Sequence, residues 1–279
     1  MIDPQRLLAL EFPEIVHAYT TRDTILYALG VGLGSDPLSP HHLQYVYERG
    51  LVALPTMAVV LAYPGFWYRD LDTGLDFSKT VHGAESIAIH APLPVASTVV
   101  AKTRIVDVID KGAGRGALVV SERAIRDGAD GRLLATVRQT AFCRADGGFG
   151  GPERREPRPA PPPDRPADHA VHFTTRPEAA LIYRLSGDPN PLHVDPETAR
   201  AAGFARPILH GLCTMGVVCH AAVAALFGHN PGALRRMECR FTAPVIPGDS
   251  IRSEFWAIPE GWGFRASVGE AAVALGTLS

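Results

Sequence analysis

The chain has 279 residues, of which 46% are hydrophobic and 20% charged, so it can bury a sizeable core. Its 27 Lys and Arg against 29 Asp and Glu give a formal net charge of −2, which excludes the basic field of a general nucleic-acid binder. The first ten residues lack a basic segment followed by an apolar run, and the four cysteines show no zinc-type spacing. We therefore expect a cytoplasmic protein with reduced thiols, no nucleic-acid partner and no membrane span.

Composition divides the chain into two halves. Proline and glycine dominate residues 147–168, where large apolar side chains nearly vanish, and this is typical of a linker. The division predicts an N-terminal domain over 1–146, a linker over 147–168 and a C-terminal domain over 169–279. Each half has the size of an ordinary domain.

The two halves share short sequence echoes in the same order. Residues 25–30, Ile-Leu-Tyr-Ala-Leu-Gly, resemble residues 181–186, Leu-Ile-Tyr-Arg-Leu-Ser. Ala-Pro-Leu-Pro at 91–94 likewise resembles Ala-Pro-Val-Ile-Pro at 243–247. The shared order favours a duplicated α+β unit in which helices precede antiparallel strands.

The elements of the second half can be taken in chain order. Residues 171–174 predict a short strand, and Thr175 with Glu178 has the form of a capping box that opens a helix ending at Gly187. Residues 212–227 are apolar on nearly every face, which predicts a buried helix followed by Gly228. Residues 234–278 alternate as strands do, with turns at 247–249 and 259–261. A buried helix wrapped by a curved antiparallel sheet is the hot-dog arrangement.

The loop 187–193, Gly-Asp-Pro-Asn-Pro-Leu-His, carries the candidate chemistry. Asp188 and His193 lie five positions apart across a segment stiffened by two prolines, so both side chains could face one water molecule. A carboxylate and an imidazole around one water suit acid–base chemistry near neutral pH. The alternatives are a purely structural turn and a metal site, although no third ligand is evident at suitable spacing.

The sequence also places Gly211 at the start of the apolar helix. The first N–H groups of a helix lack intrahelical partners, and a glycine there lets a substrate carbonyl approach closely. His210 is interpreted as a histidine of the core or one that supports the reacting groups from behind. Water activation together with an oxyanion hole is what addition of water to an α,β-unsaturated thioester requires.

These motifs resemble a known family. Residues 183–193, the His-Gly-Leu at 210–212 and residues 240–249 resemble the signature of the MaoC-like hydratase 2 family of (R)-specific enoyl-CoA hydratases. Residues 27–32, 45–48, 54–56, 82–83 and 111–112 resemble the other half of double-hot-dog members, such as the hydratase part of peroxisomal multifunctional enzyme type 2. The resemblance covers nearly the whole chain except the linker. It implies an α+β double hot-dog, with two units that each wrap a curved antiparallel sheet around a central helix.

The resemblance also implies a role for individual residues. Asp188 and His193 would activate water and shuttle protons, Asn190 would help to hold that water, and the Gly211 N–H would form the oxyanion hole. The first half would be catalytically silent, because its Asp36 and His41 lack the Asn-Pro-Leu-His order around them. The residues expected to contact the acyl-CoA are His82, Gly83, Lys111, Pro189, Pro191, Leu192 and Phe241.

The expected function is therefore a hydro-lyase that interconverts trans-2-enoyl-CoA and (3R)-3-hydroxyacyl-CoA. We expect no metal, no cofactor beyond the coenzyme A of the substrate, and a homodimer. One alternative is a dehydratase for an acyl-carrier-protein thioester or a specialised CoA thioester. Two others are a hot-dog acyl-CoA thioesterase and a non-catalytic acyl-CoA binding module, both disfavoured by the complete set of Asp188, Asn190 and His193.

Overall fold

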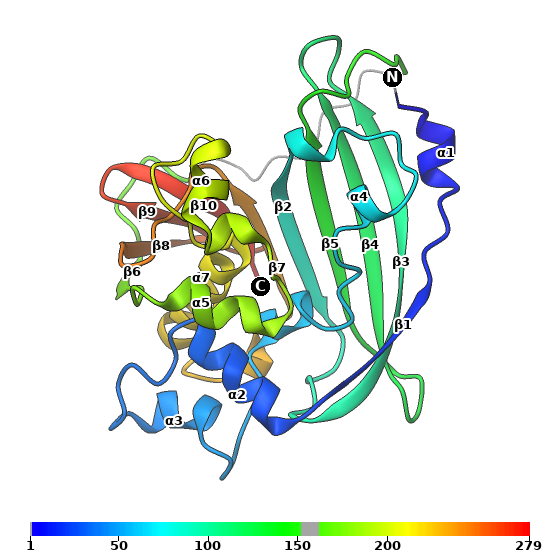
Figure 1. Ribbon diagram of the computed structural model, residues 1–279. Coiled ribbons are helices and arrows are strands. Elements are labelled where there is room, and N and C mark those ends of the chain that lie inside the picture. The colour runs from blue at the N-terminus through cyan, green and yellow to red at the C-terminus, as the bar shows by residue number, and fades with distance from the viewer. Residues whose placement is uncertain (1, 152–161) are drawn as a thin grey trace.

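The computed structural model describes residues 2–151 and 162–279. Its strands form one antiparallel sheet in the order β1-β3-β4-β5-β2-β7-β10-β9-β8-β6 (Figure 1). The strands are β1 (Glu14–Tyr19), β2 (Thr80–Ile89), β3 (Ser97–Asp110), β4 (Ala117–Asp127), β5 (Leu133–Cys143), β6 (His169–Thr174), β7 (Arg236–Phe241), β8 (Ser250–Ile258), β9 (Gly261–Val268) and β10 (Ala271–Leu278).

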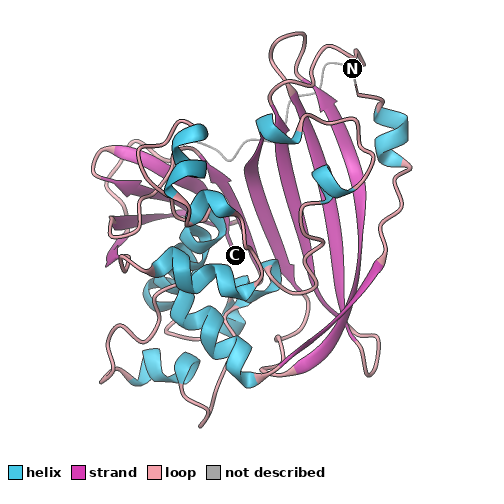
Figure 2. Ribbon diagram, viewed as in Figure 1, coloured by secondary structure: helices cyan, strands magenta, loops and turns pink. Residues whose placement is uncertain are grey.

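The helices gather mainly over the second half of the sheet, while long strands dominate the first half (Figure 2). Most are short; α2 and α7 are the longer ones. They are α1 (Pro4–Leu8), α2 (Thr21–Gly30), α3 (Pro40–Val46), η1 (Pro55–Val59), α4 (Trp67–Asp70), η2 (Phe77–Lys79), α5 (Ala179–Tyr183), η3 (Arg184–Ser186), η4 (Pro191–His193), α6 (Pro196–Ala201), α7 (Gly211–Leu226) and η5 (Pro231–Ala233).

The strand order repeats between the halves. Read from the outer edge inward, the first half runs β1-β3-β4-β5-β2 and the second runs β6-β8-β9-β10-β7. The two series meet where β2 pairs with β7, with Glu85 opposite Cys239. Each strand of one half therefore has a counterpart in the other, and the α+β double hot-dog fold is confirmed.

The central helix of the second half is α7, whose residues 212–223 are all buried. It ends at the predicted place, where Gly228 adopts a left-handed φ of 57°. Among the described residues of the first half, the short η1 occupies the corresponding position and packs against α7. Proline opens η1, and buried Arg123 donates a 2.7 Å hydrogen bond to the Val59 carbonyl near its end. The expected central helix of the first half is thus replaced by an irregular segment.

The echoed segments 25–30 and 181–186 pack against each other as α2 and α5. Gly30 allows this contact, since a Cβ there would lie 3.2 Å from the Cα of Tyr183. The predicted capping box is wrong: the Thr175 hydroxyl donates to the Asp249 carbonyl at 3.0 Å, and the N-cap of α5 is Glu178. The helical stretch does end at Gly187, whose φ is 125°.

The connection between the halves runs from the end of β5 to the start of β6, and residues 152–161 of the predicted linker lie outside the described residues. On its first-half side, the Asp110 carboxylate accepts hydrogen bonds from the N–H groups of Gly148 and Gly150. In the described part of the chain, no helix is both long and apolar enough to cross a membrane.

Candidate active site

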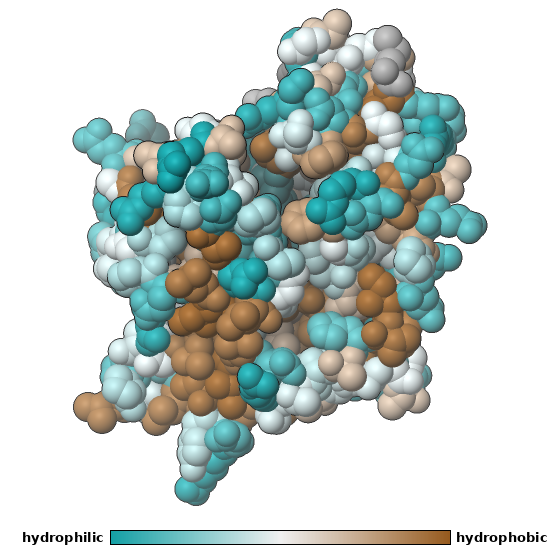
Figure 3. All heavy atoms as spheres, viewed as in Figure 1, coloured by the Kyte–Doolittle hydropathy of each residue, from teal (hydrophilic) through white to brown (hydrophobic). Residues whose placement is uncertain are grey.

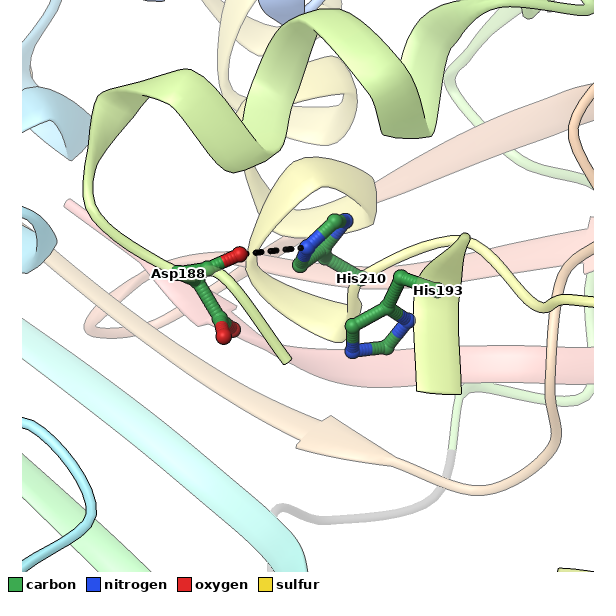
Figure 4. A group of neighbouring side chains, drawn as sticks. All are labelled: Asp188, His193 and His210. Atoms are coloured by element: carbon green, nitrogen blue, oxygen red, sulfur yellow. Dashed lines mark hydrogen bonds between the residues drawn. The ribbon is translucent and has the colours of Figure 1, made fainter. Parts of the chain in front are cut away.

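The loop between η3 and η4 carries Asp188 and leads to His193 (Figure 4). Side chains of the loop itself hold its shape. The N–H of Asn190 donates to Asp188 Oδ1 at 3.2 Å, and Asn190 Oδ1 accepts from the N–H of Leu192 at 3.0 Å. The second bond uses the oxygen of the Asn190 side-chain amide, so the NH₂ group remains as the donor end of this side chain. The loop therefore presents a carboxylate and an amide donor on a fixed backbone.

His193 is a buried base with a defined tautomer. Its Nδ1 lies 2.8 Å from the Ile208 carbonyl, and because a carbonyl only accepts, Nδ1 carries the proton and Nε2 carries a lone pair. Burial lowers the pKa of His193, opposed by its hydrogen bond to Ile208 and by the Asp188 carboxylate. A neutral imidazole with a free Nε2 lone pair can accept a proton at neutral pH.

His210 lies directly behind His193. The two rings stack with centroids 3.7 Å apart and planes inclined by 28°, and His210 Nε2–H donates to the Asp188 carbonyl at 3.2 Å. Burial, reinforced by His193, lowers the pKa of His210 to about 3. A neutral His210 therefore contacts both the Asp188 backbone and the His193 ring. Of the two interpretations, a core histidine or one that supports the reacting groups, these contacts favour the second.

These three residues also form a cluster that could be considered for a metal. One ligand atom each from Asp188, His193 and His210 lies within 4.8 Å of the others, and the sequence had given no sign of this third ligand. However, the His210 nitrogen that faces Asp188 is an N–H donor, and His193 Nδ1 is committed to Ile208. Metal binding through His210 Nε2 would have to break its bond to the loop. The arrangement suits proton transfer better than metal ligation.

Gly211 begins α7 next to this cluster. As the first residue of a 16-residue helix it offers an N–H at the positive end of the helix dipole. A Cβ at this position would lie 3.2 Å from two ring atoms of Phe241, so the aromatic ring covers the glycine closely. The structure thus brings the predicted oxyanion donor beside the predicted acid–base pair.

The first half contributes a wall of the site through β2. The His82 ring meets the Phe241 ring edge-on at 5.0 Å, and His82 Nε2 lies 2.9 Å from a carboxylate oxygen of buried Glu85. Gly83 forms a bulge in which a Cβ would lie 3.3 Å from the Thr140 carbonyl. The sequence analysis indicated His82 and Gly83 but missed Glu85. The sequence feature that could have indicated Glu85 is its spacing from His82, His-x-x-Glu, on a bulged strand.

The remaining predicted contact residues are more dispersed. Lys111 lies in the turn between β3 and β4, with Nζ 5.7 Å from the Phe142 ring centroid, at the same end of the first-half strands as His82. In the loop 187–193, Pro189 and Pro191 are exposed and Leu192 is half-buried.

The Asp and His of the first half lie in different surroundings. Asp36 is exposed, and its carboxylate accepts from the N–H of Leu38 at 3.0 Å. His41 stacks on His229 with centroids 3.6 Å apart. Neither belongs to the Asp188 cluster.

A pocket of about 350 Å³ borders the start of the loop 187–193. Its wall includes residues 60–63 after η1 and residues 185–187, which directly precede Asp188. Tyr63, which sequence reasoning missed, lies over Arg123, whose guanidinium carbon is 5.6 Å from its ring centroid. Burial raises the pKa of Tyr63, and the carboxylates of Asp188 and Glu85 raise it further. The tyrosine therefore lies where the pocket meets the site.

A double hot-dog with one acid–base cluster at the helix N-terminus beside the junction of its halves defines a class of hydro-lyases. Residues 17–145 match the MFE-2 hydratase 2 N-terminal domain, and residues 159–275 match the MaoC like domain. The chain belongs to the MaoC-like hydratase 2 family.

Individual relatives agree with this assignment along nearly the whole chain. 3-hydroxyacyl-thioester dehydratase Y of Mycobacterium tuberculosis is 41% identical over 263 residues, covering 93% of this chain and 89% of the relative. Peroxisomal enoyl-CoA hydratase 2 of Arabidopsis thaliana is 36% identical over 273 residues, covering 90% and 85%. The crystal structure of a MaoC-like dehydratase from Phytophthora capsici superposes with a TM-score of 0.85 at 31% identity, covering 99% of this chain and 98% of that one.

Proposed function

We propose that the protein catalyses the reversible addition of water to trans-2-enoyl-CoA, giving (3R)-3-hydroxyacyl-CoA. The observation that carries this proposal is the free Nε2 lone pair of neutral His193, set beside the Asp188 carboxylate and the Gly211 N–H. The hydratase 2 relatives support the R configuration.

The first step forms the C3–O bond. A water molecule donates a hydrogen bond to the Asp188 carboxylate, which orients it, and loses its other hydrogen as a proton to His193 Nε2. Its oxygen attacks C3, and the C2–C3 π electrons move toward the thioester oxygen. The Gly211 N–H stabilises the enolate charge that develops there, while the NH₂ end of Asn190 holds the attacking water.

The second step forms the C2–H bond. The enolate electron pair returns to C2 and takes the proton from His193 Nε2, which restores the neutral imidazole. Both hydrogens and the oxygen of one water are then in the product, and every protein group has returned to its starting protonation state. We propose that no metal or separate cofactor is needed, since His193 would carry the proton, the Gly211 N–H would stabilise the enolate, and the balance requires neither an oxidant nor a reductant.

The substrate would span both halves. His82 and Phe241 would flank the thioester, and the acyl chain would enter the pocket that begins at Gly187. Lys111 supplies a flexible cation that could meet a phosphate of coenzyme A. Pro189, Pro191 and Leu192 would form the rim of the loop that faces the bound thioester.

A dehydratase working on a carrier-protein thioester is the second candidate. The name of the relative from Mycobacterium tuberculosis, a 3-hydroxyacyl-thioester dehydratase, favours it, and the same residues would run the reaction in reverse. Thioester hydrolysis and binding without catalysis are less favoured because the site retains the complete set of Asp188, Asn190 and His193 beside Gly211.

The deciding experiment follows the loss of enoyl-thioester absorbance with crotonyl-CoA and with a medium-chain trans-2-enoyl-CoA, combined with chiral analysis of the product. Formation of the (3R)-hydroxyacyl-CoA supports the proposal. Release of free coenzyme A without hydration would make the protein a thioesterase. Activity only on carrier-protein thioesters would select the second candidate.

A cytoplasmic location and a homodimer stay predictions. The Arabidopsis relative is named as peroxisomal, so localisation of a tagged chain should be examined directly. Light scattering in solution will decide the oligomeric state.

A further inference from the structure

The pocket beside the catalytic loop reaches a surface with unusually exposed aliphatic side chains. Val16 and Leu185 both line the pocket, yet 65% and 61% of their surface is exposed. Leu181, which is 56% exposed, lies four residues before Leu185 along the same helical stretch. We call these three residues the apolar rim. Figure 3 shows an apolar patch over α5 and α2, the elements beside which the rim lies.

Exposed aliphatic residues are common when scattered singly, but a contiguous group needs an explanation. Here β1 of the first half supplies Val16, and the segment preceding the catalytic loop supplies Leu181 and Leu185. Two distant parts of the chain thus converge at one pocket. Val16 and Leu185 of the rim belong to the same pocket wall as Gly187, which directly precedes Asp188.

Two ionisable residues of the pocket wall, His17 and Asp23, bond within the protein. The Asp23 carboxylate accepts from the N–H and the hydroxyl of Thr20 at 2.8 and 2.7 Å. His17 Nδ1 accepts from the N–H of Ala62 at 2.9 Å. These bonds engage the charged groups of the wall, and its other members are largely aliphatic: Ile15, Val16, Leu26, Met57, Val60, Leu61, Ala62 and Leu185. Such a lining fits a hydrocarbon chain.

Size indicates which hydrocarbon would reach the rim. At about 350 Å³ the pocket is at the lower end of ligand pockets in general. A short acyl chain starting at Asp188 would end inside it. A long chain would fill it and emerge between Val16 and Leu185.

We propose that the acyl pocket is open at its outer end, and that the apolar rim binds the distal carbons of long-chain enoyl thioesters. This inference rests on the proposed function. It makes Leu181 and Leu185 determinants of chain-length preference, although they lie outside the catalytic cluster. Each methylene that the rim removes from water contributes about fourfold to binding.

The test compares substrates of different length within each variant. Leu185→Glu and the double variant Leu181→Glu/Leu185→Glu place charge where the chain would emerge. Leu38→Glu is the matched control, because Leu38 is 89% exposed and lies outside the rim. The measured quantity is the ratio of kcat/KM for trans-2-hexadecenoyl-CoA to that for trans-2-decenoyl-CoA, below the critical micelle concentration, with crotonyl-CoA as reference.

We expect the rim variants to lower the long-to-medium ratio at least about tenfold, mainly through KM, since loss of uniform binding raises KM. The control should keep the ratio of the unaltered protein. An unchanged ratio in both rim variants would overturn the proposal. So would a rim variant that only converts a dimer into a monomer in light scattering, because the rim would then be an interface between copies.

A binding measurement without turnover distinguishes failure of this inference from failure of the proposed function. If no thioester is hydrated, the proposed function fails, and calorimetry with hexadecanoyl-CoA and decanoyl-CoA still measures the rim. Weaker binding of the longer thioester to Leu185→Glu, with the shorter one less affected, supports the rim. Equal effects on both chains count against it.

Discussion

Replacing Asp188 with asparagine separates the charge of the loop from its shape. Asparagine retains an oxygen that can accept the Asn190 N–H, now 3.2 Å from Asp188 Oδ1. The backbone carbonyl that accepts from His210 is unaffected by the substitution. We therefore expect the free energy of unfolding to change by no more than about 0.5 kcal/mol.

The same substitution should strongly reduce turnover. The neutral amide no longer stabilises the positive charge that His193 gains when it takes the water proton. Loss of an acid–base partner costs about 10²- to 10⁴-fold, equivalent to roughly 3–5 kcal/mol of transition-state stabilisation. The effect should fall on kcat more than on KM, because the charge on His193 exists only during the reaction.

The assay is enoyl-thioester absorbance with crotonyl-CoA, alongside urea unfolding of the same preparation. Asp195→Asn is the matched control: Asp195 caps α6 through the N–H groups of Glu197 and Thr198, and asparagine caps about as well. The control should keep its activity. A folded Asp188→Asn protein with more than a tenth of the original kcat would refute the role given to this carboxylate.

Three further predictions concern other parts of the site. Gly211→Ala should lower kcat about 10²-fold or more in single-turnover assays, since its Cβ would lie 3.2 Å from the Phe241 ring and crowd the space in front of the N–H. Unchanged kcat would contradict the close approach of a substrate oxygen at this glycine. Joint replacement of Asp36 and His41 by asparagine should leave hydration largely unchanged, and a large loss would show that the first half is not silent. The pKa of His210 is lowered from 6.5 to about 3 by burial. Its contribution to stability is complete above pH 6.5 and falls by about 2 kcal/mol at pH 5, where the unfolded histidine binds a proton that the folded one does not. His210→Gln should weaken that dependence in urea unfolding at pH 7 and pH 5, and an equal slope would contradict the assignment.

Local sequence patterns indicated a stiff, polar loop at residues 187–193, and its shape is set by neighbouring residues; its catalytic role stays a prediction. Asp188, Asn190 and His193 lie within one short segment, and two prolines with a left-handed Gly187 fix its course. The start and end of α7 could also be predicted from the sequence, because the continuous apolar stretch and the following Gly228 are local features. The capping box failed because Thr175 bonds to Asp249, a residue far away in the chain.

Features that depend on contacts between distant parts of the chain could not be predicted from local sequence patterns. Glu85 stands behind His82 only because β2 bulges and pairs with β7. The stacking of His210 on His193 requires the loop and the start of α7 to meet. Tyr63 carries no motif, and its place beside the site depends on how η1 packs.

The loss of a central helix in the first half and the gain of a pocket have the same structural origin. In the second half α7 fills the concave side of its strands and supplies Gly211 to the site. In the first half η1 and the residues after it leave part of that space open, and Arg123 holds the segment by the Val59 carbonyl. A helix in the place of residues 55–63 would supply a second N-terminus but would occupy the volume that an acyl chain needs. On the proposed function, the second half would supply the reacting groups and the first half the space for the acyl chain, so that the two halves would form a single site.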